Sequence, residues 1–433
     1  MKRLSLFPDT TEIKNNFLTI AGQDLTSLAE KYGTPLYLYD RATMDHAVAA
    51  YQAALATSYT GPASITYAGK AYLSTVLAQW TRVHDLWVDC TGEAEIAIAQ
   101  AGGVSCKNIL VHGVNKSDAD LEVATRYAGT IVVDNLSELH RLANQFPMHG
   151  SQLPNLCLRL QPGLAVTTHA YTQTGQHNAK FGMEAEELME AVLFCKERSL
   201  PLSGLHFHQG SQFRDPTPLK PAIELALDIA KQIGFSGDWH FSPGGGWAVA
   251  YHEDELPQPD LNEYVNLIGR TIVEVCQRLQ LDLPHLHIEP GRSIVARAGV
   301  ALYRVNTVKR QEGRTWLLVD GGIADNPRHA LYGVMYSCLP AAGLDRERSE
   351  RVYIGGPYCE SGDVLIEDLP MPEVKEGELI AVPMSGAYQL SMSSNYNGAR
   401  RPAVVWLEEG KVQLVQRRET TVDLLRRDAR LEF

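Results

Sequence analysis

Short runs of β-branched and apolar residues recur along the first two thirds of the chain, separated by stretches with helical spacing. Between about residues 60 and 290 there are eight such runs: SITY (64–67), LWVD (86–89), ILVH (109–112), IVVD (131–134), LCLRL (156–160), GLHFH (204–208), DWHF (238–241) and HLHIE (285–289). Intervening segments such as AEIAIAQAG and ADLEVATRYAG have amphipathic spacing and end near a glycine that can cap a helix. Strands that alternate with helices predict a parallel sheet, and eight such units predict a closed (β/α)8 barrel.

Polar residues stand at the ends of several of these runs. Lys70 follows the first run, Asp89 ends the second, His208 ends the sixth, Gly244–Gly246 follow the seventh, and Glu289 ends the eighth. In a barrel these ends converge on one rim, where active sites lie. In the alternative, an open doubly wound sheet, they would be spread along a line. We therefore expect a TIM-like barrel with a single large site.

The pattern changes after about residue 293. Segments such as VALYRVNTV, TWLLVDGG, ERVYIGG and ELIAVP predict strands joined by turns, and AVVWLEEGKVQLV predicts a β-hairpin. The apolar segments LTIAG and TPLYLYD, before residue 40, are expected to pack with these strands. This predicts a barrel over residues 41–290 and an all-β domain built from residues 1–40 and 291–433.

Composition excludes several classes of function. The chain has 433 residues, 45% of them hydrophobic, and a formal net charge of −12, which argues against a general affinity for nucleic acid or anionic membranes. No apolar run reaches the length of a membrane span, and the N-terminal segment is too polar for a secretory signal. The seven cysteines are odd in number and form no CxxC pair. They indicate reduced thiols in a cytoplasmic protein, with neither disulfides nor a metal site.

Two motifs near the strand ends suit a phosphorylated aldehyde cofactor. YAGKA (67–71) places Lys70 on a rigid element, as a Schiff-base lysine requires, although a lone lysine is more often a solvated surface residue. SPGGGWA (242–248) follows a strand with three glycines, whose backbone N–H groups can approach a phosphate. It matches neither the dinucleotide fingerprint nor the P-loop, and a flexible loop explains it equally well.

Two further motifs can contact such a cofactor. HIEPGRS (287–293) joins Glu289, which can keep a pyridine nitrogen protonated, to Arg292, whose planar fork binds phosphate or carboxylate. HFHQGSQ (206–212) supplies His208, which can stack on a ring, and Ser211. A salt-bridged turn and a satisfied core histidine are the ordinary explanations.

Two loop motifs follow in the predicted β-domain. GPYCESGD (356–363) sets Cys359 beside an acid between turn-forming residues, where a thiol can donate or accept a proton. GAYQLSMSSNYN (386–397) holds Tyr388, whose hydroxyl can bind a phosphate oxygen. An incidental loop cysteine and a half-buried aromatic are the alternatives, but the ordered set of motifs is hard to explain by chance.

Taken in order, these motifs resemble those of the fold-type III pyridoxal-phosphate (PLP) decarboxylases, and most closely the diaminopimelate decarboxylases. The resemblance runs from DLTSLAEKYGTPLYLYD (24–40) to SMSSNYN (391–397), about nine-tenths of the chain. Other matching stretches are HGVNKS (112–117), LRLQPG (158–163), the region 168–183 and NPRHALYG (326–333). The resemblance implies a (β/α)8 barrel with a β-domain, as the hydrophobic pattern predicts.

The resemblance also implies roles for individual residues. Lys70 is similar to the lysine that holds PLP as a Schiff base, His208 to the histidine stacked on its ring, and Glu289 to the acid at its pyridine nitrogen. Tyr388 resembles a tyrosine that reaches both the cofactor phosphate and the substrate. The phosphate and substrate neighbourhood is matched by Ser211, Gly244, Gly245, Gly246, Gly291 and Arg292, and the active-site acids of the wider family by Asp89 and Glu95.

Cys359 resembles the cysteine that enters the active site across a dimer interface and protonates the carbanion after CO2 leaves. The resemblance therefore implies a homodimer with shared active sites.

The substrate depends on the far end of the pocket. Ornithine or lysine presents only an ammonium there, whereas diaminopimelate presents a second amino-acid head that requires an acid and an arginine. By resemblance Glu360, Arg328, Tyr332, Tyr388 and Arg292 bind substrate, which favours meso-diaminopimelate, with L-lysine and CO2 as products. A decarboxylase of ornithine, arginine or carboxynorspermidine is the alternative.

Four positions depart from the usual family pattern: Tyr72, Asn178, Gln209 and His329. None removes a group that the cofactor chemistry needs, although Tyr72 lies two residues from Lys70. An amino-acid racemase on a similar barrel fits poorly with the CESGD cysteine. A non-catalytic homologue should have lost the lysine, the glycine loop or the cysteine, and all three are present.

Overall fold

A computed structural model of the chain describes residues 2–145, 154–164, 175 and 179–429. The chain folds into two compact units. Residues 48–249 and 259–293 form the first, which we call the barrel unit, and residues 1–47, 250–258 and 294–433 form the second, the β-rich unit.

The barrel unit contains a closed barrel of eight parallel strands, in the order β10-β11-β12-β5-β6-β7-β8-β9. The strands are β5 (Ala63–Ala68), β6 (Trp87–Thr91), β7 (Ile109–His112), β8 (Thr130–Val133), β9 (Asn155–Arg159), β10 (Leu202–His206), β11 (His240–Ser242) and β12 (His285–Ile288). Each corresponds to one of the eight apolar runs, so the predicted barrel is confirmed.

The strand ends differ from the prediction in detail. His208 lies two residues beyond the end of β10, and Asp89 lies inside β6. The predicted run 204–208 extended past the end of β10 because Phe207, in the following loop, is apolar and as deeply buried as a residue of the strand.

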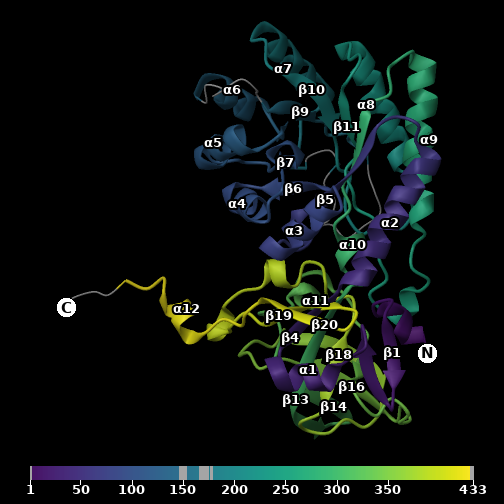
Figure 1. Cartoon of the computed structure of the whole chain (residues 1–433), viewed down its shortest axis with the longest axis vertical. Coiled ribbons are helices and arrows are strands. Elements are labelled where there is room, and N and C mark those ends of the chain that lie inside the picture. The colour runs from purple at the N-terminus through teal and green to yellow at the C-terminus, as the bar shows by residue number, and fades with distance from the viewer. Residues whose placement is uncertain (1, 146–153, 165–174, 176–178, 430–433) are drawn as a thin grey trace. The chain divides into compact units, whose positions relative to one another are not determined.

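Helices surround the barrel strands (Figure 1). They are α2 (Arg41–Ser58), α3 (Thr75–Val83), α4 (Glu93–Ala101), α5 (Asp118–Tyr127), α6 (Leu136–Gln145), α7 (Ala185–Glu197), α8 (Leu219–Ile233), α9 (Leu261–Leu279) and the short α10 (Arg292–Val295). The buried positions of α8 repeat every three or four residues, which gives the helix one apolar face. The expected glycine cap of α5 was wrong, since Ala128 occupies that position. Among the described residues, no helix combines the length and the apolarity of a membrane span.

The β-rich unit contains a nine-stranded sheet with the path β17-β16-β14-β13-β4-β19-β20, and β18 pairs with β13 and β15. Its strands are β4 (Leu36–Asp40), β13 (Gly299–Gln311), β14 (Arg314–Val319), β15 (Leu339–Pro340), β16 (Glu350–Gly355), β17 (Val364–Met371), β18 (Leu379–Val382), β19 (Ala403–Glu408) and β20 (Lys411–Gln416). β19 and β20 form the predicted hairpin. β4 pairs with both β13 and β19, so the N-terminal segment is part of this sheet.

Smaller elements complete the β-rich unit: β1 (Thr11–Lys14), β2 (Phe17–Ile20), β3 (Gln23–Asp24), α1 (Leu25–Tyr32), α11 (Arg328–Tyr332) and α12 (Thr421–Leu425). β1, β2 and β3 form a separate three-stranded sheet. One apolar core joins Leu18 of β2 and Leu25 of α1 to Leu38, Val300 and Val405 of the large sheet. Burial of these side chains therefore holds the early segment against strands from the other end of the sequence.

The residues that point into the barrel are polar at both ends of β12. On β12, His285 and His287 share one side of the strand with Glu289, the residue that follows it. A small apolar cluster of Leu110, Val132 and Cys157 fills part of the interior. Glu289 lies at the carboxyl end of the strands and His285 at the amino end.

Candidate active site

Lys70 lies in a short 3-10 turn, Gly69–Ala71, directly after β5. Glycine is required at position 69, since a Cβ atom there would lie 2.6 Å from the carbonyl oxygen of Asp89. The amide of Ala68 donates to the carbonyl of Pro290 at 3.1 Å, which ties this turn to the end of β12. The Lys70 side chain is exposed at the carboxyl end of the barrel.

The ammonium of Lys70 acts on two acids of this rim. Burial raises the pKa of Asp89, and the nearby His112 and Lys70 oppose that rise. Burial also raises the pKa of Glu95, to about 7, although its carboxylate accepts a hydrogen bond from the amide of Thr91 at 2.5 Å. The structure thus brings Asp89 and Glu95 into the electrostatic neighbourhood of Lys70.

Glu289 is a buried carboxylate, 7% exposed, with donors on both oxygens. Ser242 Oγ donates to Oε1 at 2.6 Å, and His206 Nε2 lies 3.3 Å from Oε2. His112 Nε2 lies 3.5 Å from Oε1. Burial by itself favours the neutral acid, but His206 and His112 hold the pKa of Glu289 well below its usual range. The side chain is therefore an anion deep in the barrel.

Sequence reasoning did not single out His112, His206 or Ser242 as site residues. A signal was present in the sequence: His112 ends a predicted run, His206 lies two residues before His208, and Ser242 lies two residues before Gly244. The rings of His112 and His206 lie 4.5 Å apart, centre to centre. Burial lowers the pKa of His206 to about 4, so its imidazole is neutral and donates the Nε2 proton to Glu289.

The three glycines after β11 pass close to other site residues. A Cβ atom on Gly244 would lie 2.5 Å from His208 Nδ1, and one on Gly245 would lie 2.0 Å from the carbonyl oxygen of Glu289. Gly246 has a φ of +108°, and a Cβ atom on it would lie 2.2 Å from the carbonyl oxygen of Gly210. Only glycine fits this path, so the loop is built for close approach.

Two of the glycine amides are used inside the protein. The amide of Gly244 donates to Ser242 Oγ at 3.1 Å, and that of Gly245 donates to His208 Nδ1 at 3.2 Å. The second contact fixes the proton of His208 on Nε2 when the ring is neutral. Burial, followed by the charges of Lys70 and Arg159, lowers the pKa of His208 well below its usual value. A neutral, oriented imidazole thus lies against the glycine loop.

Arg292 and Ser211 are joined by a hydrogen bond. Arg292 Nη2 donates to Ser211 Oγ at 2.9 Å, and the arginine is only 7% exposed. A Cβ atom on Gly291 would lie 3.0 Å from both Ala68 and Ala71, so this glycine lets the Arg292 segment pack against the Lys70 turn. The structure therefore brings the predicted barrel residues together at one end of the barrel.

Arg328 and Tyr388 meet within the β-rich unit. The guanidinium of Arg328 lies 4.6 Å from the ring centre of Tyr251 and 5.6 Å from that of Tyr388. Its Nη1 donates to Tyr336 Oη at 3.4 Å, while its buried Nε has no hydrogen-bond partner among the described residues. Tyr388 has a φ of +69°, a left-handed conformation that is strained for a tyrosine. Tyr332, at the end of α11, is half-buried.

Cys359 and Glu360 lie on the exposed loop between β16 and β17. The amide of Cys359 donates to Asn397 Oδ1 at 3.1 Å. The buried Asp363 orders the loop by accepting from the amides of Ile323 and Tyr358 at 2.7 and 2.8 Å. In the part of the chain that the structure describes, no hydrogen bond or ion pair joins Glu360 to Arg328, so these two do not form a pair within one chain.

The four positions that depart from the family pattern differ in their burial and hydrogen bonding. Tyr72 is buried, and its carbonyl accepts a hydrogen bond from Tyr67 Oη at 2.6 Å. The side-chain amide of Gln209 is fully buried and makes no hydrogen bond to the described residues. His329 Nδ1 lies 3.1 Å from the carbonyl oxygen of Val334. Asn178 lies outside the described residues.

Comparison with known proteins identifies relatives across almost the full length. Residues 42–296 match the family model of the pyridoxal-dependent decarboxylases, pyridoxal binding domain. Diaminopimelate decarboxylase of Bacillus subtilis is 38% identical, with 96% of each chain covered, and that of Actinosynnema pretiosum is 37% identical, with 98% of this chain and 95% of the relative covered. The crystal structure of diaminopimelate decarboxylase from M. jannaschii superposes with a TM-score of 0.91 at 28% identity and covers 98% of each chain.

The geometry of the barrel site fits the cofactor of this family. Lys70 presents an amine, the loop at 244–246 leaves no room for a Cβ atom, and Glu289 is an anion able to pair with a protonated pyridine nitrogen. The neutral His208 offers a ring face. The chain thus belongs to the pyridoxal-dependent decarboxylase family, and its cofactor is pyridoxal phosphate.

Proposed function

We propose that this chain removes CO2 from meso-2,6-diaminopimelate and releases L-lysine. Its curated relatives at 35–38% identity are named diaminopimelate decarboxylases. The structural observation that supports the chemistry most directly is the buried Glu289 carboxylate, held by Ser242 and His206 next to the glycine loop and the Lys70 turn.

Each barrel residue has a defined task in this reaction. When bound, pyridoxal phosphate supplies the electron sink that accepts the bonding electrons as CO2 leaves. Lys70 Nζ would hold the cofactor through its aldehyde carbon, and the Glu289 carboxylate would keep the pyridine nitrogen protonated. His208 offers a neutral ring for stacking, and Gly244–Gly246, Ser211, Gly291 and Arg292 line the phosphate and substrate neighbourhood. Asp89 and Glu95 lie near Lys70, and the rise of both pKa values on burial lets each carboxyl group hold a proton there.

Cys359 is proposed to return a proton to the substrate carbon after CO2 has left. Its thiol is exposed on the β16–β17 loop, as a donor that serves a second chain must be. We propose a homodimer in which this loop of each chain completes the active site of its partner. Glu360 and Arg328 make no hydrogen bond or ion pair with each other among the described residues of one chain, which agrees with this arrangement.

The second amino-acid head of the substrate is assigned to the β-rich unit. The buried Nε of Arg328 is a donor without a hydrogen-bond partner among the described residues, and a carboxylate can satisfy it. Glu360 is assigned to the distal ammonium, and Tyr332, Tyr388 and Arg292 are assigned to the remaining substrate contacts.

A substrate panel tests this proposal. Purified holoenzyme should release CO2 and L-lysine from meso-diaminopimelate, and much less CO2 from ornithine, arginine or carboxynorspermidine at equal concentration. Lys70→Ala should abolish turnover, while Lys107→Ala, at an exposed lysine of the same unit, should not. CO2 release as fast from ornithine as from diaminopimelate would refute the substrate. Racemisation without CO2 would refute the reaction.

Mixing two inactive variants tests the shared site. Lys70→Ala and Cys359→Ala chains, denatured and refolded together, should regain about a quarter of wild-type activity, because half of a random set of dimers contains one intact site. No recovery from a mixture that forms mixed dimers would show that each chain works alone.

We also propose a reducing, cytoplasmic location. All seven cysteines are free thiols, and both Cys106 and Cys359 are exposed. An exposed thiol that must donate a proton needs a compartment in which it stays reduced. Location in intact cells, observed with a fluorescent fusion, tests this point.

A further inference from the structure

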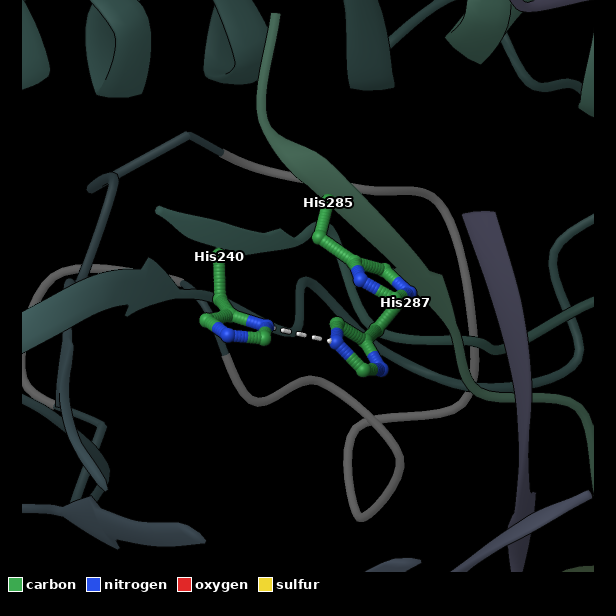
Figure 2. A group of neighbouring side chains, drawn as sticks. All are labelled: His240, His285 and His287. Atoms are coloured by element: carbon green, nitrogen blue, oxygen red, sulfur yellow. Dashed lines mark hydrogen bonds between the residues drawn. The ribbon is translucent and has the colours of Figure 1, made fainter. Parts of the chain in front are cut away.

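Three histidines gather at the amino end of the barrel, away from the cofactor residues. His240 is the first residue of β11, and His285 is the first residue of β12. These two are direct partners in the parallel pairing of the strands. His287 follows two residues later, on the same side of β12. Figure 2 shows the three rings side by side, with the hydrogen bond drawn between His240 and His287.

The spacing of the ring nitrogens suits a small cation. His240 Nδ1 lies 3.0 Å from His287 Nε2, and one nitrogen from each of the three rings lies within 4.8 Å of the others. Tetrahedral zinc with Zn–N bonds of about 2.0–2.1 Å separates its nitrogen ligands by roughly 3.3 Å. The ring of His285 is nearly parallel to those of His240 and His287, so a bound ion requires this half-buried ring to turn until its nitrogen points at the other two.

Two hydroxyl groups hold the opposite nitrogens of these rings. Ser64 Oγ lies 2.8 Å from His285 Nε2, and Thr66 Oγ1 lies 3.2 Å from His287 Nδ1. If these nitrogens carry the protons, Nδ1 of His285 and Nε2 of His287 present lone pairs. Metal-bound histidines commonly donate their second ring N–H to such a partner.

The electrostatic setting favours neutral imidazoles with an acid nearby. Burial lowers the pKa of His240, His285 and His287. The exposed carboxylate of Asp238 opposes this lowering at His240 and His285, and therefore lies near both rings. It can supply negative charge to a bound cation.

The ordinary explanation is that the histidines form a hydrogen-bonded filling of the barrel. His285 and His287 stack at 4.7 Å, and Trp87 meets His287 edge-on at 4.6 Å. A hydrogen bond between His240 Nδ1 and His287 Nε2 accounts for the nearest pair of nitrogens. The metal site is argued from the third ring nitrogen within 4.8 Å and from the hydroxyl partners on the far side of His285 and His287. Three imidazoles with an open fourth position are a common ligand set for zinc.

We propose that His240, His285 and His287 bind one divalent transition metal ion, zinc in the first instance, which links β11 to β12 at the amino end of the barrel. This departs from the expectation of no metal site, which considered only cysteine spacing. Histidines from separate strands, 45 residues apart in sequence between His240 and His285, leave no such motif.

Metal retention by untagged holoenzyme tests the proposal. After chelation and desalting, protein incubated with zinc chloride and desalted again should hold one equivalent per chain and melt at a higher temperature. The double variant His240→Gln, His285→Gln should keep its activity but bind zinc at least tenfold more weakly. The control His46→Gln, His252→Gln, at an exposed and a half-buried histidine paired with Asp9 and Asp254, should bind like wild type. Ser64→Ala should weaken binding by about tenfold.

A second test uses only the wild-type protein, so it does not require any variant to fold. Zinc-edge anomalous scattering from wild-type holoenzyme crystals soaked in zinc should give a peak among the three rings. Equal retention by wild type and the double variant would overturn the proposal. A peak confined to other residues, including His112, His206 and Glu289, would also overturn it.

Discussion

Ser242 Oγ donates a hydrogen bond of 2.6 Å to Oε1 of Glu289, so a residue from β11 holds the acid that follows β12. A hydrogen bond to a charged group contributes about 1.5–3 kcal/mol. We predict that Ser242→Ala lowers kcat/KM roughly 10- to 100-fold and weakens cofactor binding. Steady-state kinetics and a cofactor titration measure both effects. Ser203→Ala, which removes hydrogen bonds to the carbonyl of Leu156 and to Cys157 but none to Glu289, should change neither.

Stability should depend on pH through His206. Its pKa is lowered to about 4 in the folded chain, so the unfolded chain binds more protons between about pH 6.5 and 4, and stability falls as pH falls through that window. The contribution is on the order of 3 kcal/mol. His206→Gln keeps a donor for Glu289 but cannot titrate, so its urea midpoint should decline less between pH 7 and pH 4.5. An identical decline would assign the effect to other groups, such as His208.

Gly245→Ala should disrupt the site without touching a functional side chain. Its Cβ atom would lie 2.0 Å from the carbonyl oxygen of Glu289, so the loop must shift away from β12. Such overpacking costs about 1–3 kcal/mol, which predicts a loss of cofactor affinity of roughly 10- to 100-fold. In the control Gly237→Ala, the added Cβ atom would have no neighbour within 4 Å. This variant should bind cofactor normally, with a small loss of stability because the residue has a positive φ. Normal cofactor binding by Gly245→Ala would mean that the loop adjusts freely.

Arg328→Lys should impair recognition of the substrate. Lysine keeps the charge but loses the planar fork beside Tyr251 and Tyr388 and the Nε donor. We expect KM for diaminopimelate to rise about 10- to 100-fold, with a smaller change in kcat. Arg351→Lys, in an exposed pair with Asp368, serves as the control. A variant with unchanged KM would remove Arg328 from the substrate site.

Cys359→Ala should slow turnover strongly while the cofactor remains bound. Loss of a general acid typically lowers the rate by about 10²- to 10⁴-fold. The visible spectrum of the bound cofactor should be retained, which separates a lost proton donor from a damaged cofactor site. Cys106→Ala, at the other exposed cysteine, should behave as wild type. Unchanged turnover in Cys359→Ala would mean that a different group delivers the proton.

Local patterns were sufficient to predict the barrel. Each of the eight apolar runs became a strand, because burial of one strand requires apolar residues in a short continuous stretch. Strand ends were less certain, since the buried Phe207 extends the pattern of β10 into its loop.

Some site residues could be predicted from local motifs, whereas others were identified only in the structure. Lys70, Glu289 and the glycine loop lie in contiguous motifs, so their residue types and order alone indicate the cofactor chemistry. The ionisation of Glu289 depends on His112, His206 and Ser242, which come from three other strands.

Sequence alone therefore determined the alternation of strands and helices and identified Lys70, Glu289 and Gly244–Gly246, because each of these features depends on a few consecutive residues. Tertiary structure decided which distant side chains face them: the donors around Glu289, the tyrosines around Arg328, and the three histidines at the opposite end of the barrel. Such contacts join residues of different strands, and closure of the barrel, which no single segment encodes, sets their distances.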